Sequence, residues 1–189
     1  MFSRVLHLII SLLAKRKYRS YFDENVRLRG FPRFVIRGEF NAGSNVIINS
    51  GQRYNPIGGD TRCSIIVEKG AALRIGDNTG ISNCTIFCAH SITIGNNILI
   101  GGGVKIYDTD FHSIQFENRM ASYRGSLDND IRTAAVTILD GAFIGAHSII
   151  LKGVIIGKNS VVGAGSIVTK NIPDNQIWAG NPAKYIKSI

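Results

Sequence analysis

Residues 136–171 read, in sixes, VTILDG, AFIGAH, SIILKG, VIIGKN, SVVGAG and SIVTKN. The third position of every hexad is aliphatic: Ile138, Ile144, Ile150, Ile156, Val162 and Val168. Amphipathic helices repeat near 3.6 residues and half-buried strands repeat at two, so neither explains a period of six. A strict hexad with small residues in fixed columns is typical of a parallel β-helix. We therefore expect triangular turns of three hexads, with the aliphatic column inward and residues eighteen positions apart stacked on one another.

The hexads organise most of the chain into one all-β solenoid, which we place at residues 22–171. Earlier inward positions at the same spacing are Ile75, Ile81 and Phe87, and the polar segment 51–62 reads as an excursion. Residues 107–135 carry no period, so they form a loop inserted into the solenoid, and long insertions tend to be functional. Residues 172–189, interrupted by two prolines, close the chain as a tail.

Residues 1–21 are apolar over about ten positions and then basic, which predicts a short helix. The segment is too short to span a bilayer and lacks an A-x-A cleavage site, so we expect a cytoplasmic protein. Two interpretations stay open. The helix either packs on the β-helix or a neighbouring subunit, or it rests on anionic lipid at the inner face of a membrane.

The net charge of +9 indicates an anionic partner. Nucleic acid is not expected, because the sequence shows no aromatic-plus-basic recognition pattern and no helix-turn-helix or zinc-finger spacing. Cys63, Cys84 and Cys88 are odd in number and lack a CxxC pair, which indicates reduced, buried thiols.

His112 is the candidate for chemistry, since it lies in the inserted loop beside Asp108 and Asp110. Histidine accepts protons near neutral pH, and a neighbouring carboxylate can orient its ring. The loop sequence does not separate the two aspartates, although Asp108 is slightly preferred. The other histidines lie in the N-terminal helix, at a coil corner and in an outward column.

The hexads, with IGAHSIILKGVIIGKNSVVGAGSIVTKNIP and AGNPAKYI, resemble the hexapeptide-repeat acyltransferases of left-handed β-helix fold, over roughly residues 65–189. This family includes galactoside, maltose and polysaccharide O-acetyltransferases. The resemblance implies a left-handed coil, a homotrimer, and acetyl-CoA in a groove between adjacent prisms. It also implies that His112 is the general base for acetyl transfer to a saccharide hydroxyl.

The resemblance further implies positions for the ligands. Backbone groups near Gly145, Ala146 and Ala164 would hold the pantetheine arm, and Thr169 and Lys170 would follow on the same edge. Lys184 and Lys187 would lie near the nucleotide phosphates. Asn83 would contact the sugar, although it is two positions away from the family's asparagine.

The N-terminal helix with its basic flank is similar to that of enzymes that modify capsule, O-antigen or exopolysaccharide precursors. We therefore expect a cell-surface polysaccharide or lipopolysaccharide precursor as acceptor. Alternatives are an N-acetyltransferase acting on an amino sugar, a non-catalytic trimeric scaffold, and a zinc hydratase of the same fold. The zinc site would need three converging histidines, two of them five residues apart, and no such pair exists, so no metal is expected.

Overall fold

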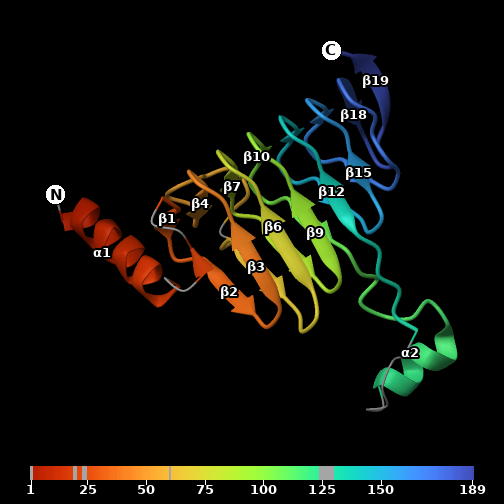
Figure 1. Ribbon diagram of the computed structural model, residues 1–189, viewed down its shortest axis with the longest axis horizontal. Helices are drawn as coiled ribbons and strands as arrows, with labels where there is room; N and C mark the ends of the chain where they lie inside the picture. Colours follow the sequence, from red (N-terminus) through yellow and green to blue (C-terminus); the bar gives the residue numbers. More distant parts are fainter. Residues whose placement is uncertain (1, 19–20, 23–24, 60, 124–129) are drawn as a thin grey trace.

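The protein is a left-handed parallel β-helix, seen in a computed structural model that describes residues 2–18, 21–22, 25–59, 61–123 and 130–189. Figure 1 shows the turns stacked in chain order, with α1 (Phe2–Lys17) at one end and the C-terminal strand at the other. Residues 1 and 19–20 of the predicted N-terminal segment, and 124–129 of the predicted insertion, lie outside the described residues.

Within the described residues the strands form three faces of a triangular prism, which we call sheets A, B and C. Sheet A holds β1 (Arg27–Gly30), β4 (Ile47–Ser50), β7 (Gly80–Ser82), β10 (Leu99–Ile100), β13 (Phe143–Ile144), β16 (Val161–Val162), β18 (Gln176–Ala179) and β19 (Lys184–Ser188). Sheet B holds β2 (Arg33–Ile36), β5 (Ser64–Val67), β8 (Thr85–Cys88), β11 (Lys105–Tyr107), β14 (Ile149–Ile150) and β17 (Ile167–Val168). Sheet C holds β3 (Glu39–Ala42), β6 (Ala72–Ile75), β9 (Ser91–Ile94), β12 (Val136–Ile138) and β15 (Ile155–Ile156).

The predicted inward column is confirmed. Its aliphatic side chains from Ile138 to Val168 are at most 1% exposed. Ile138 pairs in parallel with Ile156, and Ile144 with Val162, each eighteen positions apart. The hexad period therefore sets both the buried face and the stacking of turns, as the sequence predicts.

One earlier register prediction is wrong. Phe87 points outward and is half-buried, whereas its neighbours Ile86 and Cys88 are fully buried. Ile81 stacks on Ile100 and Ile86 on Ile106, so the corner after Ile81 is one residue shorter than the corner stacked on it. A count of six from Ile81 cannot detect the shorter corner, because Ile86 and Phe87 are adjacent and both are apolar.

The corners between sheets C and A are built by asparagine. Asn45, Asn78 and Asn97 adopt φ angles of 57°, 55° and 57°, in the left-handed region that asparagine tolerates well. Each side-chain amide donates to the next: Asn45 Nδ2 to Asn78 Oδ1, and Asn78 Nδ2 to Asn97 Oδ1, both at 3.2 Å. These stacked asparagines form tight turns along this edge of the prism and link successive turns of the coil by side-chain hydrogen bonds.

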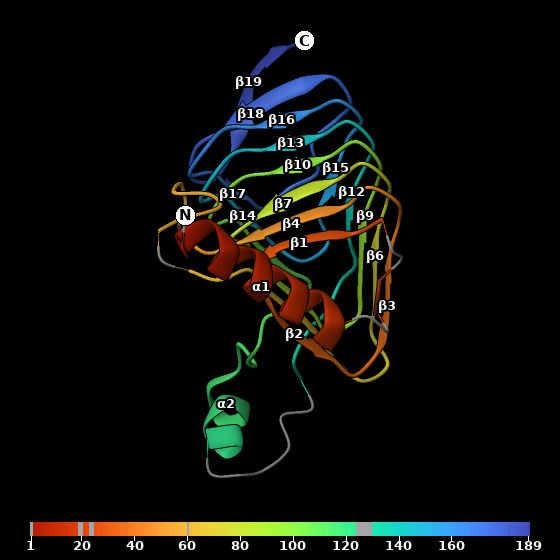
Figure 2. The same cartoon turned by 90° about the vertical axis from the view of Figure 1, so that its left-hand side faces the viewer.

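Helix α1 covers the open N-terminal end of the coil (Figure 2). Ala14 and Tyr18 are buried, and the Gly30 amide donates to Ser11 Oγ at 3.1 Å. Tyr18 packs edge-on against Phe34, with ring centroids 4.6 Å apart. Packing on the β-helix, one of the two interpretations of this segment, is thus observed. Neither this helix nor any other in the described part of the chain is long and apolar enough to cross a membrane.

The C-terminal segment continues the coil before folding back. Strand β18 pairs in parallel with β16, so the solenoid runs beyond Asn171, to Ala179. Strand β19 then returns antiparallel to β18 and extends sheet A by one exposed strand.

Candidate functional site

The insertion leaves the coil at the corner between sheets B and C, after β11, and returns at the start of β12. Its two ends form a short antiparallel stem. Thr109 bridges Thr133, the Asp110 amide donates to the Arg132 carbonyl at 3.1 Å, and the Ala134 amide donates to the Asp108 carbonyl at 3.0 Å. Beyond the stem the loop contains α2 (Phe116–Tyr123), which projects from the prism (Figure 1). The stem gives the projecting loop a defined exit direction.

Asp108 fixes this stem to the coil. Its side chain is fully buried, and its carboxylate accepts the backbone N–H groups of Ala89, His90 and Ser91 at 2.7, 2.8 and 2.8 Å. These residues form the corner of the preceding turn. The preference for Asp108 as the group that orients His112 is therefore corrected, because both carboxylate oxygens are committed to the coil backbone.

Asp110 is also tied to the coil, by an ion pair with Lys152 in which Nζ lies 3.2 Å from Oδ1. Both groups are only partly exposed. In the described part of the chain, neither Asp108 nor Asp110 hydrogen-bonds His112. The two carboxylates predicted to orient His112 thus attach the stem of the loop to the coil and do not contact the imidazole.

Phe111, immediately before His112, has a φ of 64°. A bulky residue in the left-handed region costs about 1–3 kcal/mol and persists only where its surroundings impose it. Here two edge-on aromatic contacts do so: Phe111 lies 4.8 Å from Phe87 and 5.1 Å from Tyr107, measured between ring centroids. The outward side chain of Phe87 is therefore part of the loop's anchor.

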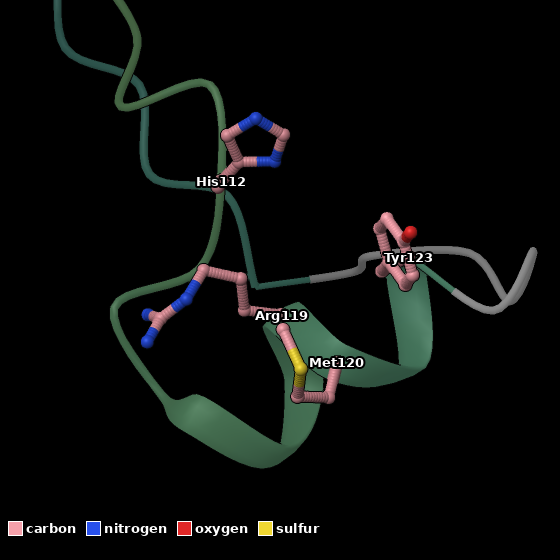
Figure 3. Close-up of a pocket in the computed structure, with 4 residues that line it drawn as sticks. All are labelled: His112, Arg119, Met120 and Tyr123. Carbon is pink, nitrogen blue, oxygen red and sulfur yellow. The ribbon is translucent and has the colours of Figure 1, made fainter.

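His112 follows this strained residue and projects into solvent. It is exposed and makes no hydrogen bond within the described residues. With Arg119, Met120 and Tyr123 of α2 it lines an open pocket of about 330 Å³. Figure 3 shows Arg119 turning its guanidinium away from the imidazole. Arg119 Nη1 instead donates to the carbonyls of Ser113 and Ile114, at 3.0 and 3.2 Å.

The pocket residues from α2 were not predicted from sequence. Ser113 Oγ accepts the Gln115 N–H at 3.0 Å, a local turn that leads into the helix without capping it, since the first helical bond runs from the Arg119 N–H to the Gln115 carbonyl. What the sequence lacks is any indication of which way the helix would face.

The predicted pantetheine contacts lie at a different corner, between sheets A and B. Ala146 and Ala164 stack as predicted, with the Gly165 amide donating to the Ala146 carbonyl at 2.8 Å. A Cβ atom on Gly145 would lie 2.5 Å from the Ala164 nitrogen, so this position accepts only glycine. Ala146 is half-buried and Ala164 exposed. The result is an open edge of small residues along which a narrow ligand could lie against backbone.

Thr169 and Lys170 do not share that edge. They follow β17 at the corner between sheets B and C, at the opposite end of the short sheet B strands. With Lys184, Trp178 and Tyr185 they line a cavity of about 280 Å³. Lys187 lies on β19, opposite Ile177, and is exposed outside that lining. Lys184, predicted to lie near the nucleotide phosphates, therefore meets Thr169 and Lys170, which were predicted for the pantetheine edge, whereas Lys187 lies outside this cavity.

The two halves of the predicted site sit on opposite edges of sheet B. The loop with His112 leaves from the B–C corner, and the small-residue column of Ala146 and Ala164 forms the A–B corner. One chain therefore presents a proton acceptor at one edge and a ligand-sized backbone edge at another.

Asn83 is not available to a substrate in this structure. It is 1% exposed, its Oδ1 accepts the Gly51 amide and its Nδ2 donates to the Asn55 carbonyl, both at 2.7 Å. Asn83 thus holds the excursion of residues 51–62 against the coil. We do not carry it forward as a sugar contact.

The thiols are held in the core. All three cysteines are buried, with the sulfur atoms of Cys63 and Cys84 3.9 Å apart. Burial raises the pKa of Cys88 to about 12, and the nearby Asp108 carboxylate adds a smaller effect in the same direction. The side chains of the described residues bring together no group of three His, Cys, Asp or Glu that could hold a metal ion.

Residues 135–170 match the family described as the hexapeptide repeat of succinyl-transferase. No curated protein matches the sequence. Among solved structures, galactoside acetyltransferase in complex with coenzyme A is 37% identical with a TM-score of 0.54, over 62% of this chain and 55% of that one. A hexapeptide-repeat-containing acetyltransferase from Vibrio cholerae is 32% identical with a TM-score of 0.55, over 61% of this chain and 62% of its own.

The polySia-specific acetyltransferase NeuO matches a larger share, 86% of this chain and 70% of its own, at 26% identity and a TM-score of 0.58. The resemblance to hexapeptide-repeat acetyltransferases is thus confirmed. The chain spans less than two thirds of the length of the galactoside and Vibrio enzymes that it matches.

Proposed function

We propose that the protein is an acetyl-CoA-dependent acetyltransferase that modifies a hydroxyl group of a saccharide, with His112 as general base. The observation that carries this proposal is the setting of His112. It is an exposed imidazole that makes no hydrogen bond within the described residues, and it follows the strained Phe111 on a stem that Asp108 anchors to the coil. The galactoside, Vibrio and NeuO acetyltransferases, the first with coenzyme A bound, share the fold at 26–37% identity and support the reaction class.

In this proposal acetyl-CoA lies along the A–B corner. The pantetheine arm runs past the backbone of Ala146 and Ala164, where small side chains leave room. The nucleotide end then leaves this corner and crosses the C-terminal end of sheet B to the cavity lined by Thr169, Lys170 and Lys184, where the two lysine ammonium groups attract phosphate.

A neighbouring subunit completes the site. Because His112 and the Ala146 edge lie on different corners of one prism, a proton acceptor next to the bound thioester must come from a second copy. Sheet A carries a suitable contact surface. Its outward column includes Leu99 and Phe143, 59% and 45% exposed, continuing to Val161 and Ile177 on the stacked strands. A lengthwise apolar stripe of this kind favours a closed ring of prisms, which we propose to be a trimer.

In the transfer step, His112 takes the proton of the acceptor hydroxyl as its oxygen attacks the thioester carbonyl. Collapse of the tetrahedral intermediate expels the coenzyme A thiolate, to which the imidazolium returns a proton. No acyl-enzyme forms, because the cysteine sulfurs are buried and the Cys88 thiol stays protonated.

His112→Ala tests the base. We expect kcat to fall about 10²–10⁴-fold, the usual contribution of a general base, while acetyl-CoA affinity by calorimetry is kept. Thiol release with hydroxyl-only and amino sugars as acceptors separates O- from N-transfer. His90→Ala is the matched control, because His90 is also an exposed histidine on a coil corner and contacts Asp108 only through its backbone N–H. Near wild-type turnover of His112→Ala would exclude this mechanism.

Subunit mixing tests the shared site. His112→Ala and Ala164→Trp should each be inactive alone, the second because an indole would fill the pantetheine edge. When equal amounts of the two variants mix at random in a cyclic trimer, about one interface in four joins an intact His112 to an intact Ala164 edge. The mixture should therefore recover about a quarter of wild-type activity. No recovery in verified mixed trimers would place both halves of the site on one chain.

A further inference from the structure

Helix α1 has a second apolar surface that the coil does not cover. The helix uses Ser11, Ala14 and Tyr18 to contact the prism. Outside these contacts, Leu8, Leu12 and Leu13 are 63%, 56% and 54% exposed, and Ile9 is 46% exposed. The spacing of these residues places them on one arc of the helix. Four large aliphatic side chains on two turns exceed the scattered apolar exposure of an ordinary surface.

Basic residues lie at one end and along one side of this surface. The last turn of α1 carries Lys15, Arg16 and Lys17, and the neighbouring strand β1 exposes Arg27 and Arg29. The sequence contains no acidic residue before Asp23. The apolar arc therefore ends in a basic cluster, which is the composition of helices that lie in a membrane interface.

A groove joins the two parts. It has a volume of about 280 Å³ and lies between α1 and β1, lined by Leu8 and Leu12 on the apolar side and by Lys15, Arg27 and Arg29 on the basic side. An aliphatic wall beside cationic groups suits a molecule with a hydrocarbon part and an anionic head.

We propose that this surface, residues 8–17 of α1 together with Arg27 and Arg29, binds an anionic lipid bilayer with the helix lying in the membrane plane. The leucines would enter the boundary between headgroups and acyl chains, and the basic cluster would contact lipid phosphates. The proposal concerns an end of the coil remote from the insertion stem in sequence, and it does not depend on the acetyltransferase reaction.

A second copy of the same surface is a less suitable occupant. Packing two of these surfaces together would bring two basic clusters into one interface, and like charges in contact disfavour association. An anionic bilayer satisfies both the apolar arc and the charge. In a ring of prisms built on the lengthwise stripe of sheet A, the α1 helices would also share one end, so several weak contacts would act together.

The test is co-sedimentation of the full-length protein with vesicles of phosphatidylcholine alone, or with 30% phosphatidylglycerol as roughly the anionic share that gives a strong surface potential. We expect binding to the anionic vesicles that weakens at least tenfold without phosphatidylglycerol and also weakens in high salt. The variant with Leu8, Leu12 and Leu13 changed to Ser should lose binding at least tenfold. The variant Arg27→Gln/Arg29→Gln should lose about fivefold per charge, as expected for basic groups at an anionic surface.

Matched controls lie elsewhere on the coil. Ile189→Ser removes an aliphatic side chain with 67% exposure at the C-terminal end, and Lys158→Gln removes an exposed charge. Both should bind as the wild type does. Melting temperatures near wild type, within about 4 °C or roughly 1 kcal/mol, show that the α1 variants still fold.

Three results would overturn the proposal: no binding of wild-type protein to anionic vesicles, equal binding to both vesicle types, or binding unaffected by the leucine changes. A smaller assembly by light scattering for the leucine variant without any vesicle effect would instead assign the surface to subunit contact. Retained vesicle binding by an inactive protein would leave this proposal standing while the proposed reaction fails.

Discussion

Asp108→Asn is the sharpest perturbation of the loop anchor, because it changes charge and hydrogen bonding with almost no change in shape. The Asp108 carboxylate accepts three backbone N–H groups in a fully buried setting. Asparagine keeps one acceptor oxygen and places an NH₂ group against at least one of these donors. One orphaned buried N–H costs about 1–3 kcal/mol, and the remaining bonds lose their charge-assisted strength, about 1 kcal/mol each. We therefore expect a loss of about 3–5 kcal/mol.

Thermal unfolding followed by circular dichroism measures this loss. For a chain of this size, about 3 kcal/mol corresponds to a fall in Tm of roughly 6–12 °C. Limited proteolysis should show cleavage within the insertion before the coil unfolds, since the coil retains its own pairing. The loosened loop should lower kcat, because it carries His112. Acetyl-CoA affinity should persist, because the substitution leaves the A–B corner unchanged.

Asp140→Asn is the control. Asp140 Oδ1 accepts the Asn96 amide at 2.7 Å at an exposed corner, and Asn96 Oδ1 already accepts the Asp77 amide at 2.8 Å in the adjacent turn. Asparagine is thus proven in this role, and the change should cost less than about 0.5 kcal/mol. If Asp108→Asn melts within 2 °C of Asp140→Asn, a span of roughly 1 kcal/mol or less, the anchoring argument is refuted.

Three further predictions concern the core, the charged end and the thiols. Ile156→Ala should cost about 2–5 kcal/mol, whereas Ile155→Ala, at a 43% exposed neighbour, should cost much less; equal Tm values would contradict the inward register. Lys184→Ala/Lys187→Ala should weaken acetyl-CoA binding by about 1 kcal/mol or less per charge, with lower salt dependence; calorimetry showing no change would remove both lysines from the site. Burial raises the pKa of the Cys88 thiol from 9.0 to about 12 in the folded chain. The protonated thiol therefore contributes fully to the free energy of unfolding below pH 9, and this contribution is lost as the pH rises towards 12. Urea unfolding at pH 8 and pH 10.5 should show a smaller loss for Cys88→Ala than for wild type, and an identical loss would contradict the shift.

The inward column from Ile138 to Val168 could be predicted from sequence because one hexad is one side of the prism. Its period is local, so each position is assigned by counting. The insertion was located by the same means, as the stretch where counting fails. The helical N-terminus followed from composition and length alone.

Only the tertiary structure decided which polar groups of the site are free. Asp108 and Asn83 have sequence contexts that suit catalysis and sugar binding, yet both are buried and saturated by backbone groups of other turns. Their partners lie at positions that depend on where each corner adds or drops a residue. The same dependence turned Phe87 outward to hold Phe111, and it placed His112 and the Ala146 edge on different corners. Hexad spacing specifies the side of the prism that a residue occupies, whereas the contacts between corners depend on three-dimensional packing that no local period encodes.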